Sequence, residues 1–582
     1  MKNIVILIIF ITVFSVKSQD FTTSFEKDKL TSTTYDECIS FYKKLDKKYE
    51  QLKMFEAGET DIGRTLHVVV ISKDGYFSPE EARKHGKAVL FINNGIHPGE
   101  PDGIDACMMF ARELAAGNNF TDILIVPHSI LNRVVVVIIP IYNVDGSLNR
   151  NNFTRANQVG PKEYGFRGNS QNRDLNRDFI KCDTKNSRSF VKIFREWKPE
   201  IFVDTHTSDG ADYQYTMTYI ATQHNKLETP LADFMLKVII PELEYEMKQQ
   251  NFEMCPYVTN FKSTPDSGIV EFPETPRYST GYASLFNTIG FVTETHMLKT
   301  HEQRVTAQYR FLAELLKITH KKRDLIINNK KAADDNVRSK NEFVLKWKLD
   351  SVNTTPLLFK GYEAKYKPSV ITGFDRLYYD RNSPYEKIIP FYNNYVTDIS
   401  VTKPAAYIVP QAWWQVIELL KLNGIEMERL SEDKMIEVES YYIEKYATPS
   451  SSYEGHYPHR NVELKKIMQN RKFYKGDYII HTNQENNNFI VHVLEPQSTD
   501  SYFNWNFFDA ILQQKEYFDD YLFEDIADSL LNSKPGLKEE FEKLKAEHEY
   551  FRTKGETQLN FIYYSTILEP EFQRYPVGRI AK

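Results

Sequence analysis

His97 and Glu100 stand three residues apart in a polar turn with Pro98 and Gly99 between them and Pro101 directly after them. An imidazole and a carboxylate at this spacing can bind one borderline-soft cation, and the prolines restrict the backbone that carries them. The turn follows the apolar run 88–92, which predicts a strand, and precedes the segment 101–116, which predicts a helix. We interpret this turn as one half of a zinc site.

The same spacing recurs at His492 and Glu495, where the histidine lies inside the strand-like run 489–494. There we favour an ordinary sheet histidine beside a surface glutamate, because an alternating apolar run is typical of a strand. The order of the other motifs must therefore distinguish the two copies.

Further polar motifs follow the first copy in a consistent order: Asn143-Val-Asp145-Gly146, Asp174-Leu-Asn176-Arg177-Asp178, Asp204-Thr-His206-Thr and Glu294-Thr-His296. A His-x-x-Glu pair, an Asn-Arg pair, a distant histidine at a strand end and a late glutamate together resemble the M14 (carboxypeptidase A-like) family of zinc metallocarboxypeptidases. The resemblance covers about residues 30 to 320. Each motif is short, but the four in this order are specific.

The resemblance implies that His97, Glu100 and His206 bind one Zn²⁺ per chain, with the fourth position left to water. Such a water has its pKa lowered to about 7, which supplies a nucleophile at neutral pH. Glu294 matches the family glutamate that takes the proton from this water and delivers it to the leaving amine. Acidic residues in the segment 204–212 are expected to orient His206.

Asn176 and Arg177 resemble the pair that binds the terminal carboxylate of the substrate. Physical chemistry supports this pairing, because a planar guanidinium holds a carboxylate through two parallel hydrogen bonds that lysine cannot copy. The family also implies a mobile tyrosine ahead of the base, and Tyr278 and Tyr282 are both candidates in the loop region 273–282.

A second arginine is implied that polarises the scissile carbonyl and stabilises the oxyanion. We choose Arg167 for this role, with Arg155 and Arg173 as rivals in a loop region that is hard to align. The pocket loop contains no spacing that assigns a specificity residue, so the preferred C-terminal side chain stays open.

The elements that must position these residues alternate between strands and helices. Apolar runs predict strands at 66–72, 88–93, 133–139 and 200–206, and helical spacing predicts helices at 34–56, 101–116, 186–197 and 231–249. This alternation predicts an α/β fold with a mixed, largely parallel sheet flanked by helices, which agrees with the carboxypeptidase-like resemblance. Because ligands of such sheets bind beyond the carboxyl ends of strands, the placement of His97, Asn143 and His206 at strand ends supports a site there.

The 582 residues exceed one ordinary domain. We expect a catalytic domain over 19–320, a linker over 321–340 and a β-rich or mixed accessory region over 341–582. A net charge of −6 argues against nucleic acid as a partner, because the chain lacks the basic field that phosphate neutralisation needs. Peptide or protein C-termini are the expected substrates.

Residues 1–18 predict a cleaved signal peptide, because Lys2 precedes a 13-residue apolar stretch that is too short to span a membrane. Export would place the protein outside the cell, in a periplasm or on the cell surface, and no membrane span is expected in the mature chain. In such an oxidising compartment the four cysteines can pair in three ways, and the sequence does not choose among them.

Three classes of function fit these observations. The leading one is an exported zinc metallocarboxypeptidase that hydrolyses the C-terminal peptide bond. The second is a zinc amidohydrolase of the same scaffold that acts on cell-wall peptides or acylated amino acids, which the Asn176-Arg177 pair disfavours where the substrate lacks a terminal carboxylate. The third is an inert binding protein, which would require a missing ligand or base, and none is missing.

Overall fold

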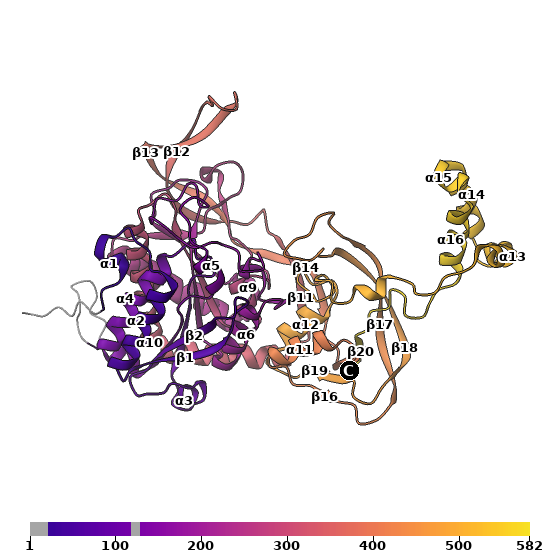
Figure 1. Ribbon diagram of the computed structural model, residues 1–582, viewed down its shortest axis with the longest axis horizontal. Helices are drawn as coiled ribbons and strands as arrows, with labels where there is room; N and C mark the ends of the chain where they lie inside the picture. The colour runs from indigo at the N-terminus through magenta and orange to yellow at the C-terminus, as the bar shows by residue number, and fades with distance from the viewer. Residues whose placement is uncertain (1–20, 118–127, 582) are drawn as a thin grey trace, which may run out of the picture. The chain divides into compact units, whose positions relative to one another are not determined.

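The long apolar runs of the sequence form the central strands of an eight-stranded sheet in the computed structural model of the protein (Figure 1). The structure describes residues 21–117 and 128–581. Its contacts divide the chain into two compact units. The first unit comprises Met1–Asp334 and Leu349–Tyr395, and the second comprises Asp335–Lys348 and Val396–Lys582.

The sheet of the first unit is mixed and has a parallel centre. Strands β4, β3, β5 and β10 run parallel to one another, while β1, β2 and β6 pair in antiparallel fashion. The central strands are buried along their whole length, as their unbroken apolar sequences predict. In spatial order the strands are β1 (Leu52–Glu59), β2 (Thr65–Ile71), β4 (Val134–Ile139), β3 (Ala88–Asn93), β5 (Ile201–Ser208), β10 (Ile289–His296), β6 (Met217–Ala221) and β7 (Met254–Pro256).

Helices join these strands, and several begin at the capping residues that their sequences contain. Thr34 starts α2 with a capping box in which Glu37 takes part, and Thr184 caps α6. The helix after β3 ends where Gly117 adopts a left-handed conformation. The α-helices of this unit are α1 (Ser24–Asp28), α2 (Tyr35–Lys48), α3 (Pro79–Lys84), α4 (Asp102–Ala116), α5 (Val144–Leu148), α6 (Lys185–Trp197), α7 (Thr229–Phe234), α8 (Ile240–Gln249), α9 (Ser279–Ser284) and α10 (His301–Ser339), whose residues after Asp334 belong to the second unit.

An aromatic cluster fills the space between α6 and the centre of the sheet. Phe190 and Phe194 of α6 contact Phe91 of β3 and Phe202 of β5 through edge-to-face ring pairs. Such pairs add about 0.5–1.5 kcal/mol each beyond the burial of their area. This cluster keeps β3 and β5 in fixed positions, and the site residues follow from the ends of these two strands.

The four cysteine thiols are unpaired and buried in the described structure. Burial raises the pKa of the Cys107 thiol to about 12, so it stays protonated at neutral pH. None of the three disulfide connectivities that the sequence allowed is formed.

A long β-hairpin belongs to the first unit although it follows α10 in the chain. It consists of β12 (Thr355–Pro368) and β13 (Asp375–Tyr392), and β13 pairs with β9 (Ile269–Val270), which in turn pairs with β8 (Thr259–Asn260). Its base packs into a cluster that includes Phe359, Ile389 and Tyr213. Figure 1 shows the hairpin extending away from the helices and the large sheet of the first unit.

The second unit contains a six-stranded antiparallel sheet, and helices lie between some of its strands along the chain. This composition agrees with the expected β-rich or mixed region. Its strands, in spatial order, are β16 (Glu428–Arg429), β19 (Tyr478–His481), β15 (Ala406–Val409), β20 (Gly578–Ile580), β17 (Lys434–Ala447) and β18 (Arg460–Phe473), and β11 (Glu342–Leu349) pairs with β14 (Tyr395–Thr402). Its helices are α11 (Trp414–Leu422), α12 (Asn487–Leu494), α13 (Asp520–Leu531), α14 (Leu537–Glu547), α15 (Glu549–Thr553) and α16 (Gly555–Thr566).

The structure confirms the predicted fold class, an α/β catalytic region followed by a β-rich region, but several local expectations differ. The segment 489–494 is helical in α12, not a strand. The predicted helix 34–56 ends at Lys48, and the chain then forms β1. The run 489–494 is short and apolar, and periodicity alone does not distinguish helix from strand in such a run.

The expected linker 321–340 also differs, because α10 continues through it to Ser339. Ile326, Ala333 and Val337 recur at helical spacing and are fully buried, so this stretch has an apolar face despite its many charges. Within the described ranges, none of the helices combines the length and the apolar composition that crossing a membrane requires.

Candidate metal centre and active site

The first two site residues lie in the turn between β3 and α4. Gly95 has a φ of 66°, a conformation that favours glycine, and the Glu100 N–H donates to the carbonyl of His97 at 2.8 Å. Asn93, the last residue of β3, donates from its side chain to Asp204 of β5 at 3.0 Å. The turn therefore brings His97 and Glu100 to the carboxyl ends of the parallel strands, where β5 supplies His206.

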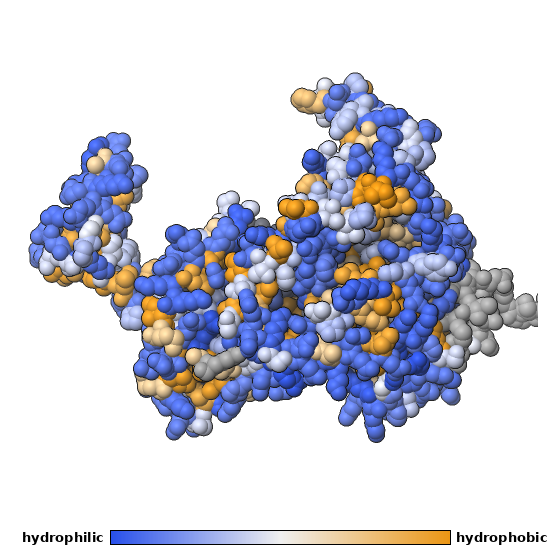
Figure 2. Space-filling view, turned by 180° about the vertical axis from the view of Figure 1, so that it is seen from behind, coloured by the Kyte–Doolittle hydropathy of each residue, from blue (hydrophilic) through white to orange (hydrophobic). Residues whose placement is uncertain are grey.

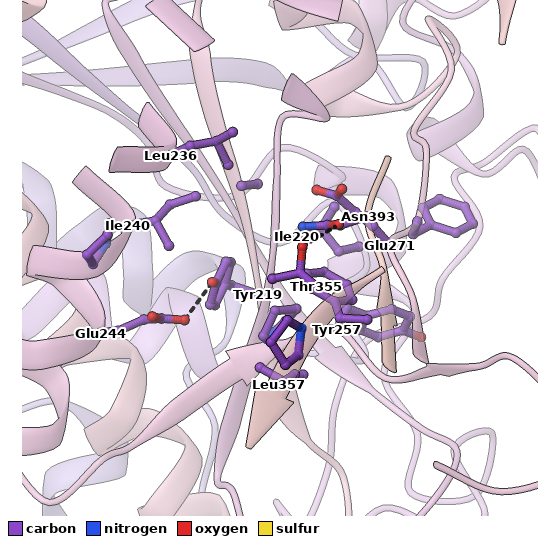
Figure 3. Close-up of a pocket in the computed structure, with 16 residues that line it drawn as sticks. Tyr219, Ile220, Leu236, Ile240, Glu244, Tyr257, Glu271, Thr355, Leu357 and Asn393 are labelled. Carbon is purple, nitrogen blue, oxygen red and sulfur yellow. Dashed lines mark hydrogen bonds between the residues drawn. The ribbon is translucent and has the colours of Figure 1, made fainter. Parts of the chain in front are cut away.

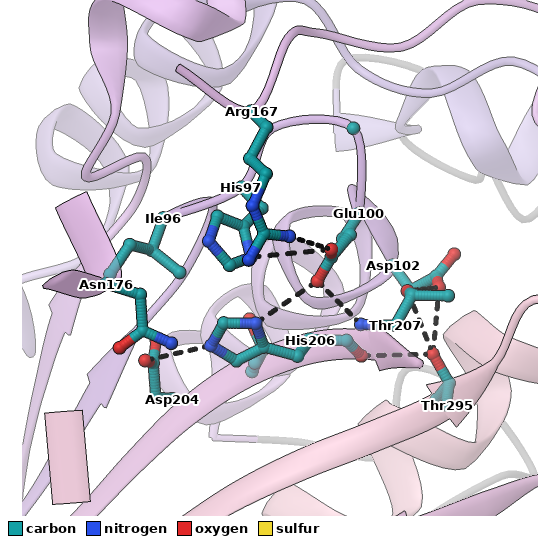
Figure 4. Close-up of polar contacts among 12 residues, drawn as sticks. Ile96, His97, Glu100, Asp102, Arg167, Asn176, Asp204, His206, Thr207 and Thr295 are labelled. Atoms are coloured by element: carbon teal, nitrogen blue, oxygen red, sulfur yellow. Dashed lines mark hydrogen bonds and ion pairs between the residues drawn. The ribbon is translucent and has the colours of Figure 1, made fainter. Parts of the chain in front are cut away.

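His97, Glu100 and His206 converge in space (Figure 4). Each is 3% exposed, and one ligand atom from each lies within 4.8 Å of the others. The His97 Nδ1 atom is 3.4 Å from Glu100 Oε1, and the His206 Nδ1 atom is 3.1 Å from Glu100 Oε2. Among the described residues this is the group of three histidine, cysteine or carboxylate side chains that can hold a metal ion.

Two aspartates orient the imidazole rings from the other side. Asp174 Oδ1 lies 2.9 Å from His97 Nε2, and Asp204 Oδ2 lies 3.0 Å from His206 Nε2. We assign the proton of each ring to Nε2 on this network, which leaves both Nδ1 atoms as metal donors. The buried His97 Nδ1 has no hydrogen-bond partner among the described residues. Two imidazole nitrogens and a carboxylate so arranged fit the His₂Glu donor set of a catalytic zinc site.

The charges around the three ligands keep Glu100 ionised. Burial opposes its ionisation, but Arg155 and His97 outweigh burial and hold the pKa of Glu100 well below its ordinary value. Arg155 Nη1 lies 2.8 Å from Glu100 Oε1, and the Thr207 N–H donates to the other oxygen at 2.9 Å. Burial likewise opposes the charging of His206, but Asp204 and Glu100 raise its pKa above the usual range. Glu100 is thus a carboxylate at neutral pH.

Glu294 lies on the strand next to His206. The two residues are paired in register between the parallel strands β10 and β5. Burial raises the pKa of Glu294 to about 8, His206 opposes this rise, and the Glu100 and Glu274 carboxylates add to it. A carboxyl group with a raised pKa beside a metal centre has the properties of a proton acceptor and donor.

A polar cavity of about 480 Å³ connects these residues. Its lining contains eight of the residues that the sequence analysis selected: His97, Glu100, Arg167, Asn176, Arg177, His206, Tyr278 and Glu294. It also contains residues that were not selected, namely Arg155, which had been only a rival, and Asp209, Tyr257, Phe272 and Glu274.

Asp174 ties the arginines of the cavity to the metal ligands. Its Oδ2 accepts from Arg167 Nε at 2.9 Å, and Arg177 Nη1 lies 3.8 Å away. Arg177 also stacks on Tyr278, with its guanidinium carbon 4.3 Å from the ring centroid. The Ser279 N–H donates to Asn176 Oδ1 at 3.1 Å, which fixes the orientation of that amide.

The structure corrects one of the two candidate tyrosines. Tyr282 is fully buried inside α9, where its ring packs against Phe194 and Phe286, and it does not line the cavity. Tyr278 lies just before α9, in extended backbone, and does line the cavity. The rival Arg173 also lies outside the cavity lining and contacts Asp183 at 2.6 Å.

Some site residues that the sequence analysis did not select were easier to recognise from the sequence than others. Asp174 lies two residues before Asn176 inside a motif already selected, so its proximity to the site was readable from the sequence. Arg155 is 55 residues away from Glu100, its ion-pair partner, and no local pattern connects them. Glu274 accepts from the N–H and the hydroxyl of Thr280 at the start of α9.

A second, mostly apolar cavity of about 210 Å³ shares the walls Ile220, Tyr257 and Phe272 with the first one (Figure 3). Its lining comes from β6, from α8 and from the base of the β12–β13 hairpin. Tyr219 donates to Glu244 at 2.7 Å on one side of it. The polar site therefore adjoins an apolar space within the first unit.

Comparison with known proteins agrees with this geometry. Residues 38–229 match the sequence model of the M14 peptidase family, which is described as zinc carboxypeptidase. Carboxypeptidase 2 of Trichophyton rubrum is 21% identical over 492 residues, which cover 82% of this chain and 84% of that protein. Probable carboxypeptidase 2 of Arthroderma benhamiae is 20% identical over 490 residues, which cover 81% and 86%.

Solved structures similar to part of this chain include a metallo-carboxypeptidase from Burkholderia cenocepacia, with a TM-score of 0.37, 14% identity and coverage of 50% of this chain and 70% of that one. Carboxypeptidase A from Helicoverpa armigera has a TM-score of 0.36, 13% identity and coverage of 52% and 74%. The fold and the site define a metallohydrolase whose three ligands come from an α/β unit. Residues 38–229 thus match the M14 family of zinc carboxypeptidases, which are peptide hydrolases, and the chain carries an additional C-terminal region beyond the matched residues.

Proposed function

We propose that the protein is an exported metallocarboxypeptidase that removes the last residue from peptides or proteins. The observation that supports this function is the cavity in which Arg177 and Asn176 line the same space as the three metal ligands and Glu294. We call Arg177 and Asn176 the carboxylate clamp. Because the clamp binds a free carboxylate at a fixed distance from the hydrolytic centre, the bond that is cut lies at a fixed position from the end of the peptide.

His97, Glu100 and His206 would hold the zinc ion, which when bound supplies a water molecule of lowered pKa. Glu294 takes the proton of the attacking water and delivers it to the leaving amine. Arg167, which is 45% exposed and held by Asp174, donates to the carbonyl oxygen as negative charge develops there. Arg155 compensates the charge of Glu100 and holds the carbonyl of Thr207 at 3.0 Å.

The clamp is prepared before substrate arrives. Stacking on Tyr278 and the hydrogen bond from Arg177 Nη1 to the carbonyl of Asn176, at 2.8 Å, restrict the guanidinium. Preorganisation of this kind lowers the entropy that binding must spend on ordering side chains. The carboxylate then binds with two parallel hydrogen bonds, a geometry that an ammonium group does not offer.

The test compares one peptide with a free C-terminal carboxylate and the same peptide with a C-terminal amide. The amide leaves Arg177 desolvated and without its ligand, a loss of several kcal/mol by analogy with breaking a buried ion pair. At about 1.4 kcal/mol per decade, the free acid is expected to react at least ~10³-fold faster in kcat/KM. Arg177→Ala is expected to bring this ratio close to one, chiefly by slowing the free acid, and Arg177→Lys is expected not to restore it.

Arg173→Ala is the matched control, since Arg173 lies four residues away and pairs with Asp183 outside the cavity lining. It should leave the ratio at its wild-type value. Equal cleavage of acid and amide by the wild type would contradict the proposal and favour a zinc amidohydrolase of the same scaffold. Cleavage at internal bonds would contradict it as well.

Export rests on the apolar stretch within residues 1–18, which lie outside the described residues. N-terminal sequencing of the protein recovered outside the cytoplasm of the expressing cell is expected to begin close to Gln19. Retention inside the cell with Met1 in place would contradict export and leave the peptidase proposal untouched.

A further inference from the structure

The β12–β13 hairpin ends in a turn that exposes apolar side chains to solvent. Val370, Ile371 and Phe374 are 98%, 88% and 78% exposed. The hairpin is anchored at its base by the buried residues Phe359 and Ile389. From Phe359 to Pro368 the strand advances roughly 30 Å at about 3.3 Å per residue. We call residues 369–374 the hairpin tip, and Figure 2 shows a small hydrophobic area among hydrophilic residues at this far end of the hairpin.

The hairpin tip is ordered by its own polar groups. The Ser369 N–H donates to the carbonyl of Phe374 at 2.9 Å, and the Gly373 N–H donates to the carbonyl of Ser369 at 3.1 Å. The Ser369 hydroxyl accepts from the N–H groups of Ile371 and Thr372, and the Thr372 hydroxyl accepts from that of Phe374. A turn whose N–H groups are bonded internally loses little when it enters an apolar medium.

Charged and aromatic residues follow directly behind the apolar ones, beginning with Asp375, which is paired in register with Pro368. Lys367 and Arg376 are paired in register across the two strands, next to the hairpin tip. Like charges directly opposite each other destabilise a hairpin unless an anion lies between them. Neither residue takes part in an ion pair among the described residues, whereas Lys365, two residues further back, contacts Asp380 at 2.5 Å. The Lys367 ammonium instead lies 4.7 Å from the ring centroid of Tyr378.

The order along the hairpin is therefore an apolar end, then a net positive charge because Lys367 and Arg376 outnumber Asp375, then tyrosine and paired charges. This is the order in which a lipid bilayer presents its acyl chains, its anionic headgroups and its aqueous interface. We propose that the hairpin tip inserts into the interface of an anionic membrane and holds the enzyme at its surface. The proposal concerns a peripheral contact and is independent of the proposed peptidase activity.

The shape of the tip favours lipid over a protein partner. Its apolar side chains lie at the turn that ends a two-stranded arm, where Val370, Ile371 and Phe374 are almost fully exposed. A fluid acyl layer needs no complementary shape, and burying large apolar side chains in it is favourable for each one. The pair Lys367 and Arg376 supplies the selectivity for negatively charged headgroups.

The experiment is co-sedimentation of the full-length mature protein with vesicles of phosphatidylcholine, with and without phosphatidylserine. The wild type is expected to bind the vesicles that contain phosphatidylserine, and more weakly as salt increases. The double variant Val370→Asp with Ile371→Asp is expected to lower the vesicle partition coefficient at least ~10-fold, because two charged groups replace two apolar ones at the inserted end. Lys367→Glu with Arg376→Glu is expected to abolish the preference for anionic vesicles.

Val352→Asp is the matched control, since Val352 is an apolar residue of the same unit that is 85% exposed but lies outside the hairpin tip. It should bind as the wild type does. Peptide hydrolysis at the wild-type level in every variant shows that the variants fold. Absence of wild-type binding, or equal binding of the tip variant, overturns the proposal. Self-association of the wild type that the tip variant abolishes, without vesicle binding, would also overturn it and identify a second copy of the chain as the partner.

Discussion

Asp174→Asn tests how the candidate zinc site is held, because one carboxylate orients a ligand and two arginines. Asp174 has a side chain that is 12% exposed, lies 2.9 Å from both His97 Nε2 and Arg167 Nε, and lies 3.8 Å from Arg177. Burial opposes its ionisation, but His97 and the two arginines outweigh burial and hold its pKa well below the ordinary value. The wild-type residue is therefore charged throughout any assay.

Asparagine has the same size and can still accept from His97 Nε2, so the geometry is expected to survive while the charge is lost. Removing such an outer partner typically costs 10–100-fold in metal affinity. This equals about 1.4–2.7 kcal/mol at 1.36 kcal/mol per decade. In this variant Arg167 Nη1 still has Glu100 Oε1 at 3.5 Å as an ion-pair partner. We therefore expect the Arg167 side chain to shift toward Glu100, and this displacement should lower kcat further.

The assay is a competition between the protein and a chelator of known zinc affinity, followed by kinetics at saturating zinc. Asp183→Asn is the control, because Asp183 is also largely buried and contacts two cations, Arg173 and Lys181, each at 2.6 Å. An unchanged zinc affinity in Asp174→Asn, or an equal loss in Asp183→Asn, would refute the reasoning that the carboxylate tunes the ligand.

Two further predictions follow from buried groups. Glu294→Gln should keep zinc and bind substrate while kcat falls by ~10² or more, as loss of a positioned proton acceptor implies. The control is Glu200→Gln, at a buried carboxyl whose pKa is raised to about 7, and it should leave kcat unchanged. Loss of zinc in a folded Glu294→Gln variant would show that Glu294 is a metal ligand. Burial opposes the charging of His301, but Asp102 at 2.7 Å and Asp105 raise its pKa, so its stabilising contribution is complete below pH about 6.5 and is lost as the pH rises through the raised value. Hydrogen exchange in α4 should therefore differ most between the wild type and His301→Asn at low pH, and a difference independent of pH would contradict this linkage.

The order and the chemistry of the site motifs could be predicted from the sequence because each depends on neighbours in the chain. The apolar runs that form β3 and β5 are continuous, and the residues that follow their ends must lie at one edge of the sheet. His97, Glu100 and His206 were selected by their spacing and by the resemblance of the motif order to the M14 family, strand-end placement supported His97 and His206, and the structure brings the three together. Tyr278 and Tyr282 lie in one short loop region, so local spacing did not separate the surface residue from the core residue.

Contacts between distant parts of the chain were decided only by the tertiary structure. Asp174 is 77 residues from His97, and Arg155 is 55 residues from Glu100, so no periodicity links the members of either pair. The hairpin of residues 355–392 joins the first unit because β13 pairs with Ile269 and Val270, far earlier in the chain. Periodicity and caps report which face of an element is buried, but which elements meet depends on how the whole chain packs, and this packing sets the partners, the charges and the pKa values of the site.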